Sequence, residues 1–361
     1  MRGPLDEALR DRRVLVTGHT GFKGSWLSMW LDRLEASVSG LALEPATDPA
    51  MYEVCGLRDI VDSTIADVGD LAAVKAVFAR VQPEVVFHLA AQPIVRISYD
   101  EPVETYRTNV MGTVHVLEAA RECASTRAVV VVTSDKCYEN REWSRGYRED
   151  DSLGGKDPYS SSKACAEIVT AAYANSFFGP HATAAAVTTA RAGNVVGGGD
   201  WSPDRLIPDA ARALARGDEL AVRNPGHVRP WQHVLEPLGG YLMLATRLLE
   251  SEAGFDGSWN FGPHEDSMCR VECVIDRFVT MWGSGHWKDM SDRNAPHEAG
   301  TLKLDSTKAH RDLGWQPVLD LDSALRLTVD WYKCFYSHGD VRSLTYEQIE
   351  AYEQSVAAAG D

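Results

Sequence analysis

The fold is decided by residues 13–24, RVLVTGHTGFKG, together with the apolar-periodic stretch that continues from them to Leu34. A short β-branched run gives way to three regularly spaced glycines, Gly18, Gly21 and Gly24. This order predicts a strand, a glycine turn and a helix. Glycines let the backbone approach a pyrophosphate, whose charge meets the unpaired N–H groups and the positive dipole of the helix N-terminus. An ordinary tight turn is the alternative for three glycines alone, and the surrounding pattern disfavours it.

The same alternation continues along the first half of the chain. Short apolar runs occur at 37–43, 63–66, 84–91, 128–133 and 184–189, between helix-like segments at 70–81, 102–123 and 158–177. Such alternation predicts an α/β fold, a Rossmann-like doubly wound parallel sheet covered on both faces. Beyond residue 190 the pattern is less regular, which predicts a smaller C-terminal substrate-binding lobe over the carboxyl edge of the sheet. We therefore expect a dinucleotide-binding domain over 1–190, with returns near 230–262, and a lobe formed mainly by 191–361.

Composition and charge limit the possible partners. The chain has 361 residues, 44% of them apolar, and its 52 acidic and 36 basic side chains give a net charge of −16. Such a chain repels nucleic acids and anionic membranes, so we expect neither as a partner, and any phosphate ligand must meet a local group of basic residues.

Cysteine usage and hydropathy exclude further classes. The seven cysteines form no C-x-x-C pair, and no matching pair of Cys or His completes a zinc site, so we expect neither disulfides nor a metal. No apolar run approaches the roughly 18 residues of a spanning helix, and the N-terminus has no apolar signal segment. We expect a cytoplasmic protein.

The adenosine half of a dinucleotide site has a weaker signature. Asp67 and Val68 follow the third expected strand, where they could contact an adenine ring, but Asp67 could equally cap a helix that starts near Leu71. The second strand usually ends in an acid that binds the ribose hydroxyls, yet no acid occurs before Glu44. No arginine stands there for a 2′-phosphate either, so we expect NAD rather than NADP.

A second motif, DPYSSSK at residues 157–163, indicates catalysis. Asp157 and Pro158 are typical of an N-cap and a first helical position, which places Tyr159 and Lys163 one turn apart on one helix face. A phenol of pKa about 10 acts as a base near neutral pH only when a neighbouring ammonium favours its anion. A solvated surface pair is the alternative, and it would be the default if these two residues stood alone.

Polar residues at the end of another strand support the catalytic interpretation. Ser134, Asp135 and Lys136 directly follow the run at 128–133, and doubly wound sheets place their chemistry at such carboxyl ends. Ser134 could hydrogen-bond the hydroxyl that Tyr159 deprotonates. A simple polar turn is the alternative.

Taken in order, the motifs resemble those of the extended short-chain dehydrogenase/reductases that act on nucleotide sugars. The matching segments are GxxGxxG at 18–24, HLAAQ at 88–92, TNVxGT at 108–113, Ser134 and YxxxK at 159–163. Within that superfamily the chain is similar to the CDP-glucose 4,6-dehydratases, through TSDKCYEN at 133–140, GGKDPYSSSK at 154–163, RAGNVVGGGDW at 191–201 and RPWQHV at 229–234. The resemblance covers about residues 10 to 335.

The resemblance implies bound NAD and an internal redox cycle. Hydride passes from sugar C4 to NAD, water leaves across C5 and C6, and hydride returns to C6. Tyr159 would be the base at the 4-hydroxyl, Lys163 would lower its pKa and hold the nicotinamide ribose, and Ser134 would orient the hydroxyl. The implied cofactor-binding residues are Gly18, Thr20, Gly21, Phe22, Lys23, Gly24, Asp67, Val68, Leu89, Ala90, Ala91, Thr108, Tyr159 and Lys163.

Elimination needs a base at C5 and an acid for the 6-hydroxyl, and Asp135 and Lys136 are the candidates. The dTDP-glucose dehydratases have Asp-Glu at these two positions. A lysine serves as the base only if burial or nearby cations lower its pKa, and an aspartic acid serves as the acid only if it stays protonated. We expect Asp135 as acid and Lys136 as base, and the opposite assignment remains open.

The diphosphate of the substrate needs cations on an otherwise acidic protein. Arg229 is the strongest candidate by its motif, whereas Arg205 and Arg191 could equally be solvated. Trp201 and Trp231 could line the sugar or base pocket or belong to the core, and His88 and His233 are interpreted as structural. The expected substrate-binding residues are Gln92, Ser134, Asn194, Arg205, Arg229 and His297.

Two other functions compete with a CDP-glucose dehydratase. One is a 4-epimerase, or a dehydratase for another nucleotide sugar, with the same Tyr-Lys-NAD centre. The other is a silent dinucleotide-binding protein, which would be free to lose Tyr159, Lys163 or Ser134. We also expect a homo-oligomer, dimer or tetramer, with a homodimer formed through the helices at 102–123 and 158–177.

Overall fold

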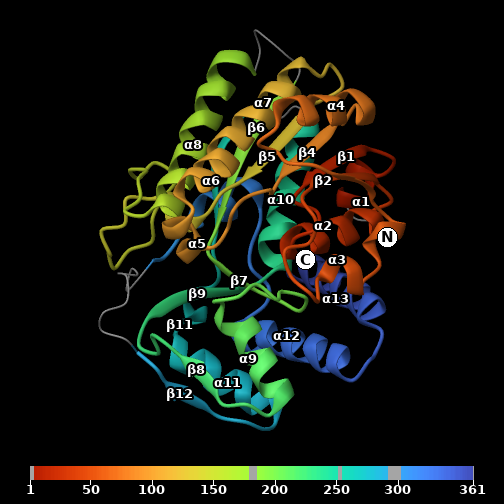
Figure 1. The fold of residues 1–361 in the computed structure, drawn as a ribbon. Helices are drawn as coiled ribbons and strands as arrows, with labels where there is room; N and C mark the ends of the chain where they lie inside the picture. Colours follow the sequence, from red (N-terminus) through yellow and green to blue (C-terminus); the bar gives the residue numbers. More distant parts are fainter. Residues whose placement is uncertain (1–3, 179–184, 251–253, 292–301, 361) are drawn as a thin grey trace.

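The computed structural model describes residues 4–178, 185–250, 254–291 and 302–360 (Figure 1). Its centre is a seven-stranded parallel sheet in the order β10-β6-β5-β4-β1-β2-β3. The predicted Rossmann-like α/β class is therefore confirmed. The strands of this sheet are β1 (Arg13–Thr17), β2 (Ser37–Ala42), β3 (Asp62–Ile65), β4 (Val85–His88), β5 (Ala128–Val132), β6 (Ala186–Ala192) and β10 (Gly257–Phe261).

The strand order reverses at β1, and this reversal positions the site. Val16 on β1 lies opposite Gly40 on β2 and opposite Phe87 on β4. From β1 the chain continues to β2 and β3 on one side of it, and then crosses to β4 on its other side. The crevice outside the carboxyl ends of β1 and β4 is where such sheets bind ligands.

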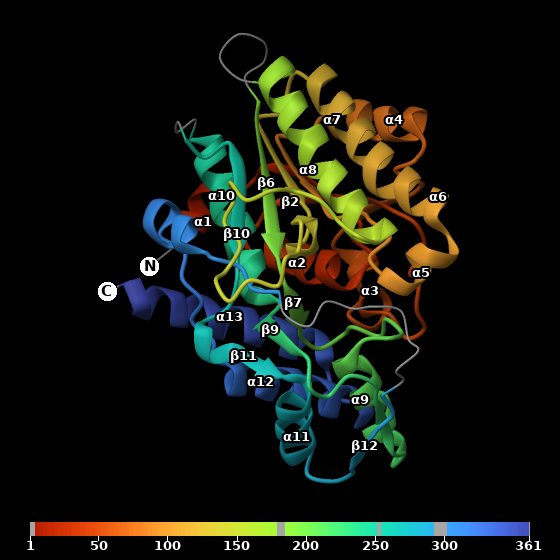
Figure 2. The same ribbon diagram turned by 90° about the vertical axis from the view of Figure 1, so that its left-hand side faces the viewer.

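Helices cover both faces of the sheet, as Figure 2 shows. The helices α4, α6, α7 and α8 lie on one side of it, and α1, α2 and α10 lie on the other. The expected helix at 102–123 is interrupted by a π-helical turn, η2 (Arg107–Met111). The helices of the first half are α1 (Pro4–Leu9), α2 (Phe22–Arg33), α3 (Met51–Val54), η1 (Leu57–Asp59), α4 (Leu71–Val81), α5 (Val95–Asp100), α6 (Pro102–Tyr106), α7 (Gly112–Glu122), η3 (Asp135–Cys137) and α8 (Pro158–Phe177).

The second half of the chain is divided between the main sheet and a smaller lobe. The lobe, at the bottom of Figure 1, contains the sheets β11-β9-β7 and β12-β8, whereas β10 pairs with β6 in the main sheet. Its strands are β7 (Asn194–Val196), β8 (Leu220–Val222), β9 (Val228–His233), β11 (Met268–Arg270) and β12 (Trp287–Asp289). The helices of this half are α9 (Leu206–Arg216), α10 (Leu235–Leu249), η4 (Glu265–Ser267), α11 (Val271–Trp282), η5 (Ala309–Leu313), α12 (Leu321–Tyr336) and α13 (Val341–Gly360).

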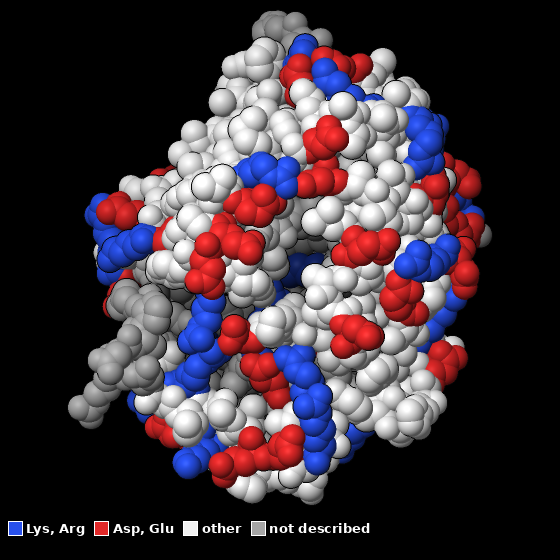
Figure 3. Space-filling model, in the orientation of Figure 1, with Lys and Arg blue, Asp and Glu red and all other residues white. Residues whose placement is uncertain are grey.

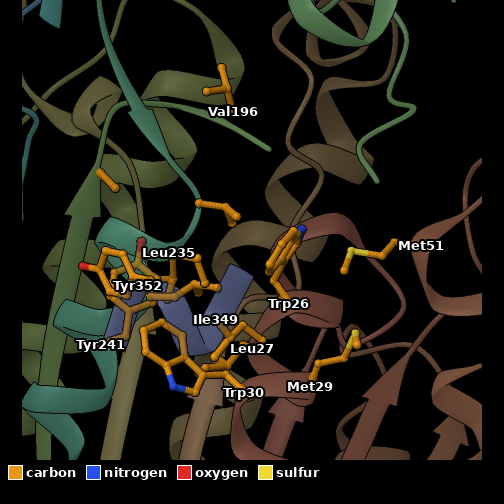
Figure 4. Close-up of a cluster of buried hydrophobic side chains, with 14 of the residues drawn as sticks. Trp26, Leu27, Met29, Trp30, Met51, Val196, Leu235, Tyr241, Ile349 and Tyr352 are labelled. Carbon is orange, nitrogen blue, oxygen red and sulfur yellow. The ribbon is translucent and has the colours of Figure 1, made fainter. Parts of the chain in front are cut away.

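Aromatic and aliphatic side chains from distant segments form the core beneath α2 (Figure 4). Trp26 and Trp30 on α2 are buried, and the Trp30 ring meets Tyr352 of α13 edge-on at 5.6 Å between centroids. The Trp30 indole N–H donates to Glu353, so even this large side chain has its polar group satisfied. The C-terminal helix α13 thus packs against α2, the helix that follows β1.

Two glycines of the first turn are required by close packing. Gly18 has φ +77, and a Cβ there would lie 2.8 Å from the Ala90 nitrogen. A Cβ at Gly24 would lie 2.1 Å from the Gly18 carbonyl oxygen. Both positions therefore exclude any side chain, which brings the turn, the start of α2 and the end of β4 together.

The buried carboxyl of Glu236 on α10 predicts a pH dependence of stability. It accepts hydrogen bonds from the Val318 and Leu319 amides and from the Tyr352 hydroxyl, and burial raises its pKa to about 7. An unfolded glutamate has a pKa of about 4.3, so the folded protein binds more protons between these values, and stability falls as pH rises from about 4 to about 7. The loss for this group is on the order of 3 kcal/mol.

The measurement is the free energy of unfolding in denaturant at pH 5 and pH 7.5 for the wild type and Glu236→Gln, whose amide cannot ionise. We expect the variant to gain relative stability as pH rises. Glu272→Gln, on α11 with a side chain that is 41% exposed, is the control. A stability difference between wild type and Glu236→Gln that does not change with pH would contradict the assignment.

Candidate active site

A pocket of about 1050 Å³ lies at the carboxyl edge of the main sheet, between it and the smaller lobe. Its walls include the turn after β1, the ends of β4 and β5, the start of α8 and residues of β7 to β9. Figure 3 shows a hollow near the middle of one face with basic side chains at its bottom. Acidic and basic side chains both surround it, and residues of both signs, such as Asp135 and Lys136, line the pocket.

The glycine turn forms one wall of this pocket, and α2 begins directly after it. Gly21 is the N-cap, its N–H donates to the Gly18 carbonyl, and Ser25 donates to Gly21. The amides of the first helical turn have no partners within the helix, so this end is suited to an anion. The predicted residues Gly18, Thr20, Gly21, Phe22, Lys23 and Gly24 all line the pocket.

Lys23 has an environment that the motif alone did not reveal. Its ammonium lies close enough to Arg205 and Lys163 to feel their charges, with Asp135 and Asp200 acting in the opposite direction. Burial, followed by the two cations, lowers the pKa of Lys23 to about 7. Part of the basic character of the pocket therefore depends on pH near neutrality.

The next feature is the pair Asp67 and Val68, which the sequence predicts to lie beside an adenine ring. Asp67 and Val68 line the pocket, but Asp67 pairs with Arg107 and accepts from the Gly69 amide. The N-cap of α4 is Asp70, which accepts from Ala72 and Ala73, so the alternative role of Asp67 as a helix cap is wrong.

His19 occupies space beside the end of β2. Its ring lies where a side chain at Gly40 would stand, since a Cβ there would be 2.4 Å from the ring. Burial lowers the pKa of His19 to about 4, and its Nε2 is 2.7 Å from the Ser63 hydroxyl. The motifs did not single out His19. The available sequence signal for its position was Gly40, a glycine on β2, the strand that lacks the expected acidic residue at its end.

Tyr159 and Lys163 lie on α8, whose start is as predicted. Asp157 caps the helix by accepting from the Ser160 amide, and Pro158 is its first residue. Burial raises the pKa of Tyr159 to about 12, while a hydrogen bond with Ser134 and the charge of Arg205 act to lower it. Burial lowers the pKa of Lys163 to about 8. Ser134 and Arg205 thus favour the phenolate, whereas burial and the charges of Asp135 and Asp157 disfavour it.

Asp135 and Lys136 follow Ser134 in the short helix η3. The Ser134 hydroxyl donates to Asp135 Oδ1 at 3.0 Å, and the Lys136 ammonium is 3.9 Å from the same oxygen. Asp135 Oδ2 is buried and has no hydrogen-bond partner among the described residues. A buried carboxylate oxygen without a partner is unusual in a folded protein, which marks Asp135 as a candidate functional residue.

The candidate phosphate-binding arginines separate into two groups. Arg205 and Arg229 line the pocket; Arg205 pairs with Asp200 at 3.0 Å, and Arg229 lies 3.2 Å from His227 Nδ1. Arg191 does not line it, because its guanidinium is buried against Glu167.

Most of the remaining expected residues also reach the pocket. Leu89, Ala90, Ala91, Thr108, Asn194 and Trp231 line it. Gln92 does not, because its amide bonds Thr105 and the Ile94 nitrogen, and His297 lies outside the described residues. Trp201 packs against Trp331 in the core. His88 and His233 are buried, and desolvation lowers the pKa of each to about 3.

Two classes of site are not found in the described part of the chain. No group of three or more His, Cys, Asp or Glu side chains there is placed to hold a metal ion. Within the same ranges, no helix is long and apolar enough to cross a bilayer.

Comparison with known proteins identifies the family of the chain. The family model for GDP-mannose 4,6 dehydratase matches residues 15–328. The CDP-glucose 4,6-dehydratase of Salmonella typhimurium is 48% identical over 346 residues, which cover 95% of this chain and 96% of that protein.

Solved structures share the fold at lower identity. A UDP-glucose 4-epimerase from Thermotoga maritima superimposes with a TM-score of 0.76 at 22% identity, over 89% of this chain and 99% of that one. A dTDP-glucose 4,6-dehydratase from Streptomyces venezuelae has a TM-score of 0.76 at 23% identity, over 91% and 98%. The resemblance inferred from the motifs is confirmed: the chain belongs to the GDP-mannose 4,6 dehydratase family, within the extended short-chain dehydrogenase/reductases.

Proposed function

We propose that this protein is a CDP-glucose 4,6-dehydratase, which converts CDP-glucose to CDP-4-dehydro-6-deoxyglucose and water with NAD as a regenerated cofactor. The observation that carries the proposal is that Tyr159, Lys163 and Ser134 share one pocket wall with the Asp135-Lys136 pair. The first three suit oxidation of a hydroxyl, and the pair supplies the acid and base that elimination requires. The 48% identical relative is named for the same reaction.

The residues present fit a bound dinucleotide. The turn has no room for a side chain at Gly18 or Gly24, so its backbone can approach a pyrophosphate directly. The first-turn amides of α2 would bind that group, and Lys163 would bind the nicotinamide ribose. NAD bound there would supply an acceptor for the hydride of sugar C4 and, once reduced, a donor of hydride to C6.

The first step is removal of the proton from the sugar 4-hydroxyl. Tyr159 takes this proton, and Ser134 orients the hydroxyl through the hydrogen bond that it shares with Tyr159. A lysine ammonium one helical turn away, that of Lys163, would favour the phenolate. The charge of Arg205 acts in the same direction. Because burial alone raises the pKa of the phenol, these groups are needed together.

The second step is loss of water across C5 and C6. A ketone at C4 acidifies the C5 proton, which Lys136 removes, while Asp135 donates a proton to the leaving 6-hydroxyl. Asp135 lines the pocket, and its buried Oδ2 has no hydrogen-bond partner among the described residues. When C6 regains a hydride, C5 must regain a proton, and Lys136 would return the proton that it took from C5.

Arg229 is proposed to bind the substrate diphosphate, which predicts a loss of affinity on its removal. Arg229→Ala should raise KM for CDP-glucose about 10- to 100-fold, because a charge-assisted hydrogen bond is worth about 1.5–3 kcal/mol. The effect on kcat should be small, since Arg229 stands away from the reacting carbons. Arg270→Ala, on the neighbouring strand β11 but exposed, is the control. An unchanged KM would remove Arg229 from the site.

The proposed reaction is tested by incubating the purified protein with NAD and, separately, CDP-, dTDP-, UDP- and GDP-glucose. We expect CDP-glucose to lose 18 mass units per molecule, about the mass of one water, without net NADH. Epimerisation without loss of water would overturn the dehydratase assignment in favour of the alternative. Dehydration of another nucleotide sugar in preference to CDP-glucose would keep the chemistry and correct the substrate.

We infer further that the protein is a homodimer formed through α6, α7 and α8. Apolar side chains protrude from this helical layer: Val103 of α6 is 80% and Ile168 of α8 is 58% exposed, and Met111 of η2 and Phe177 of α8 are also exposed. A patch of this kind on a soluble helix pair is typical of an interface. Light scattering should give twice the chain mass for the wild type and a monomer for Val103→Glu with Ile168→Glu, whereas Val356→Glu on α13 should remain dimeric. A monomeric wild type would contradict the inference, and a tetramer would require a second surface.

A cytoplasmic location is supported by the cysteines. All seven are free thiols, as expected for a reducing compartment.

A further inference from the structure

A buried ion pair lies directly behind the catalytic wall of the pocket. Glu167, on α8, and Arg191, on β6, are joined at 2.7 Å, and each side chain is only 2% exposed. Neither lines the pocket, so neither can touch substrate or cofactor there. Two charges are expensive to bury, so a pair in this place calls for a specific reason.

Glu167 links the helix that carries the catalytic residues to two strand ends. It stands one turn after Lys163 and accepts hydrogen bonds from the Thr133 and Thr189 hydroxyls as well as from Arg191. Thr133 immediately precedes Ser134 in the chain. The carboxylate therefore holds α8 in register with the strand end from which Ser134 projects.

Arg191 is fixed from its other side by aromatic rings. Its guanidinium lies over the Tyr138 ring, 4.9 Å from the centroid, and donates to the Tyr138 hydroxyl at 2.7 Å. Tyr138 stacks on Tyr147, which stacks on Trp143. The cation is thus held in one place, where it neutralises one side of the Glu167 carboxylate.

The effect on Lys163 is electrostatic rather than a contact. Lys163 Nζ donates to the Val132 carbonyl at 3.4 Å and makes no ion pair with Glu167 among the described contacts. The Glu167 charge raises the Lys163 pKa, as does Cys137 of η3, while burial lowers it to a net value of about 8. Lys23 of α2 and His88 of β4 also face this ammonium.

We propose that Glu167 and Arg191 are positioning residues for Lys163: Glu167 keeps the buried ammonium charged, and Arg191 occupies the carboxylate so that Lys163 stays directed to the pocket. A lone carboxylate one turn away would draw the ammonium into a direct pair, out of reach of Tyr159. Glu167 therefore exerts a negative electrostatic field on Lys163 without forming an ion pair with it. Its role in turnover rests on the proposed dehydratase function, but its effect on Lys163 does not.

The two members of the pair should have opposite effects, which a purely structural role would not produce. Glu167→Gln leaves Lys163 facing the Arg191 cation alone, so its titration midpoint should fall by about one pH unit or more. Arg191→Met leaves Lys163 facing the Glu167 anion alone, so the midpoint should rise by about one unit. A structural role would move the midpoints in the same direction, or not at all.

Competitive acetylation measures this without substrate. The full-length protein is treated with traces of acetic anhydride between pH 6 and 11, and the extent of labelling at Lys163 is read by peptide mass spectrometry, with exposed Lys75 on α4 as internal reference. Arg191→Lys, which keeps the charge but loses the second hydrogen-bonding arm, should leave the midpoint near that of the wild type. Shifts in the same direction for Glu167→Gln and Arg191→Met, or no shifts, would overturn the proposal.

Either single variant could fail to fold because it buries an unpaired charge. The double variant Glu167→Gln with Arg191→Met avoids this, and it should lower the midpoint by less than Glu167→Gln would, since the nearer carboxylate dominates. No fall in the double variant would also overturn the proposal. If the midpoints shift as expected but CDP-glucose is not dehydrated, the proposed function fails and the positioning role stands.

Discussion

Tyr159→Phe is expected to lower kcat for CDP-glucose dehydration by about 1000-fold or more, with little change in KM. A positioned general base contributes about 10²- to 10⁴-fold, and the later steps cannot begin until C4 is oxidised. The change removes one buried hydroxyl whose described partner is Ser134, and it keeps the ring that fills the wall of the pocket. The fold should therefore persist, and the loss should be confined to chemistry.

The measurement is the single-turnover rate of bound NAD reduction after mixing with CDP-glucose. Neither NADH nor product should appear in the variant on the wild-type timescale. Tyr173→Phe, on the same helix but away from the pocket, is the matched control and should retain wild-type rates. More than a tenth of the wild-type rate in Tyr159→Phe would show that another group is the base.

Lys136→Met is expected to separate oxidation from elimination. Tyr159, Lys163 and Ser134 remain, so C4 should still be oxidised, but the C5 proton would have no base. Turnover should fall by about 100-fold or more, while reduced cofactor accumulates towards one per active site. The increase in NADH absorbance on adding CDP-glucose, compared with loss of water by mass spectrometry, distinguishes the two steps.

A control for charge is available in the same pocket. Lys156→Met removes one cation from the wall but should not cause NADH to accumulate. If Lys136→Met turns over at the wild-type rate, the assignment of Lys136 as base is wrong. If Asp135→Asn instead gives the same accumulation and Lys136→Met does not, the acid and base roles are reversed.

The parts of the fold that depend on local signals could be predicted accurately. The strand, turn and helix at 13–34 are decided by β-branched residues, glycines and apolar periodicity, all within one short segment. The helix at 158–177 was predicted with its observed bounds because Asp157 and Pro158 mark its start. The π-helical turn at Arg107–Met111 has no such signal, so the segment 102–123 was predicted as one regular helix.

The site was predictable as a set of residues but not as a set of environments. Ser134 and Asp135 follow a strand, and a doubly wound sheet brings the carboxyl ends of its strands to one edge. Tyr159 and Lys163 follow the helix cap at Asp157. The approach of Lys23 to Lys163, and the filling by His19 of the space beside Gly40, join residues that only the packed sheet brings together. Arg191 lies outside the pocket for a similar reason. The sequence shows the arginine, but only the folded chain shows that it pairs with Glu167.

The sequence by itself determined the doubly wound class, the glycine turn at which α2 begins and the cap at which α8 begins. It could do so because glycine spacing, periodicity and helix caps act over a few residues, where backbone geometry alone decides the outcome. Only the tertiary structure decided the charges at the site. The pKa values of Tyr159, Lys163 and Lys23 depend on burial and on cations and anions contributed by segments far apart in the chain. Desolvation and Coulomb forces act through space, so an acidic chain can hold anionic ligands in a pocket whose cations the fold has gathered.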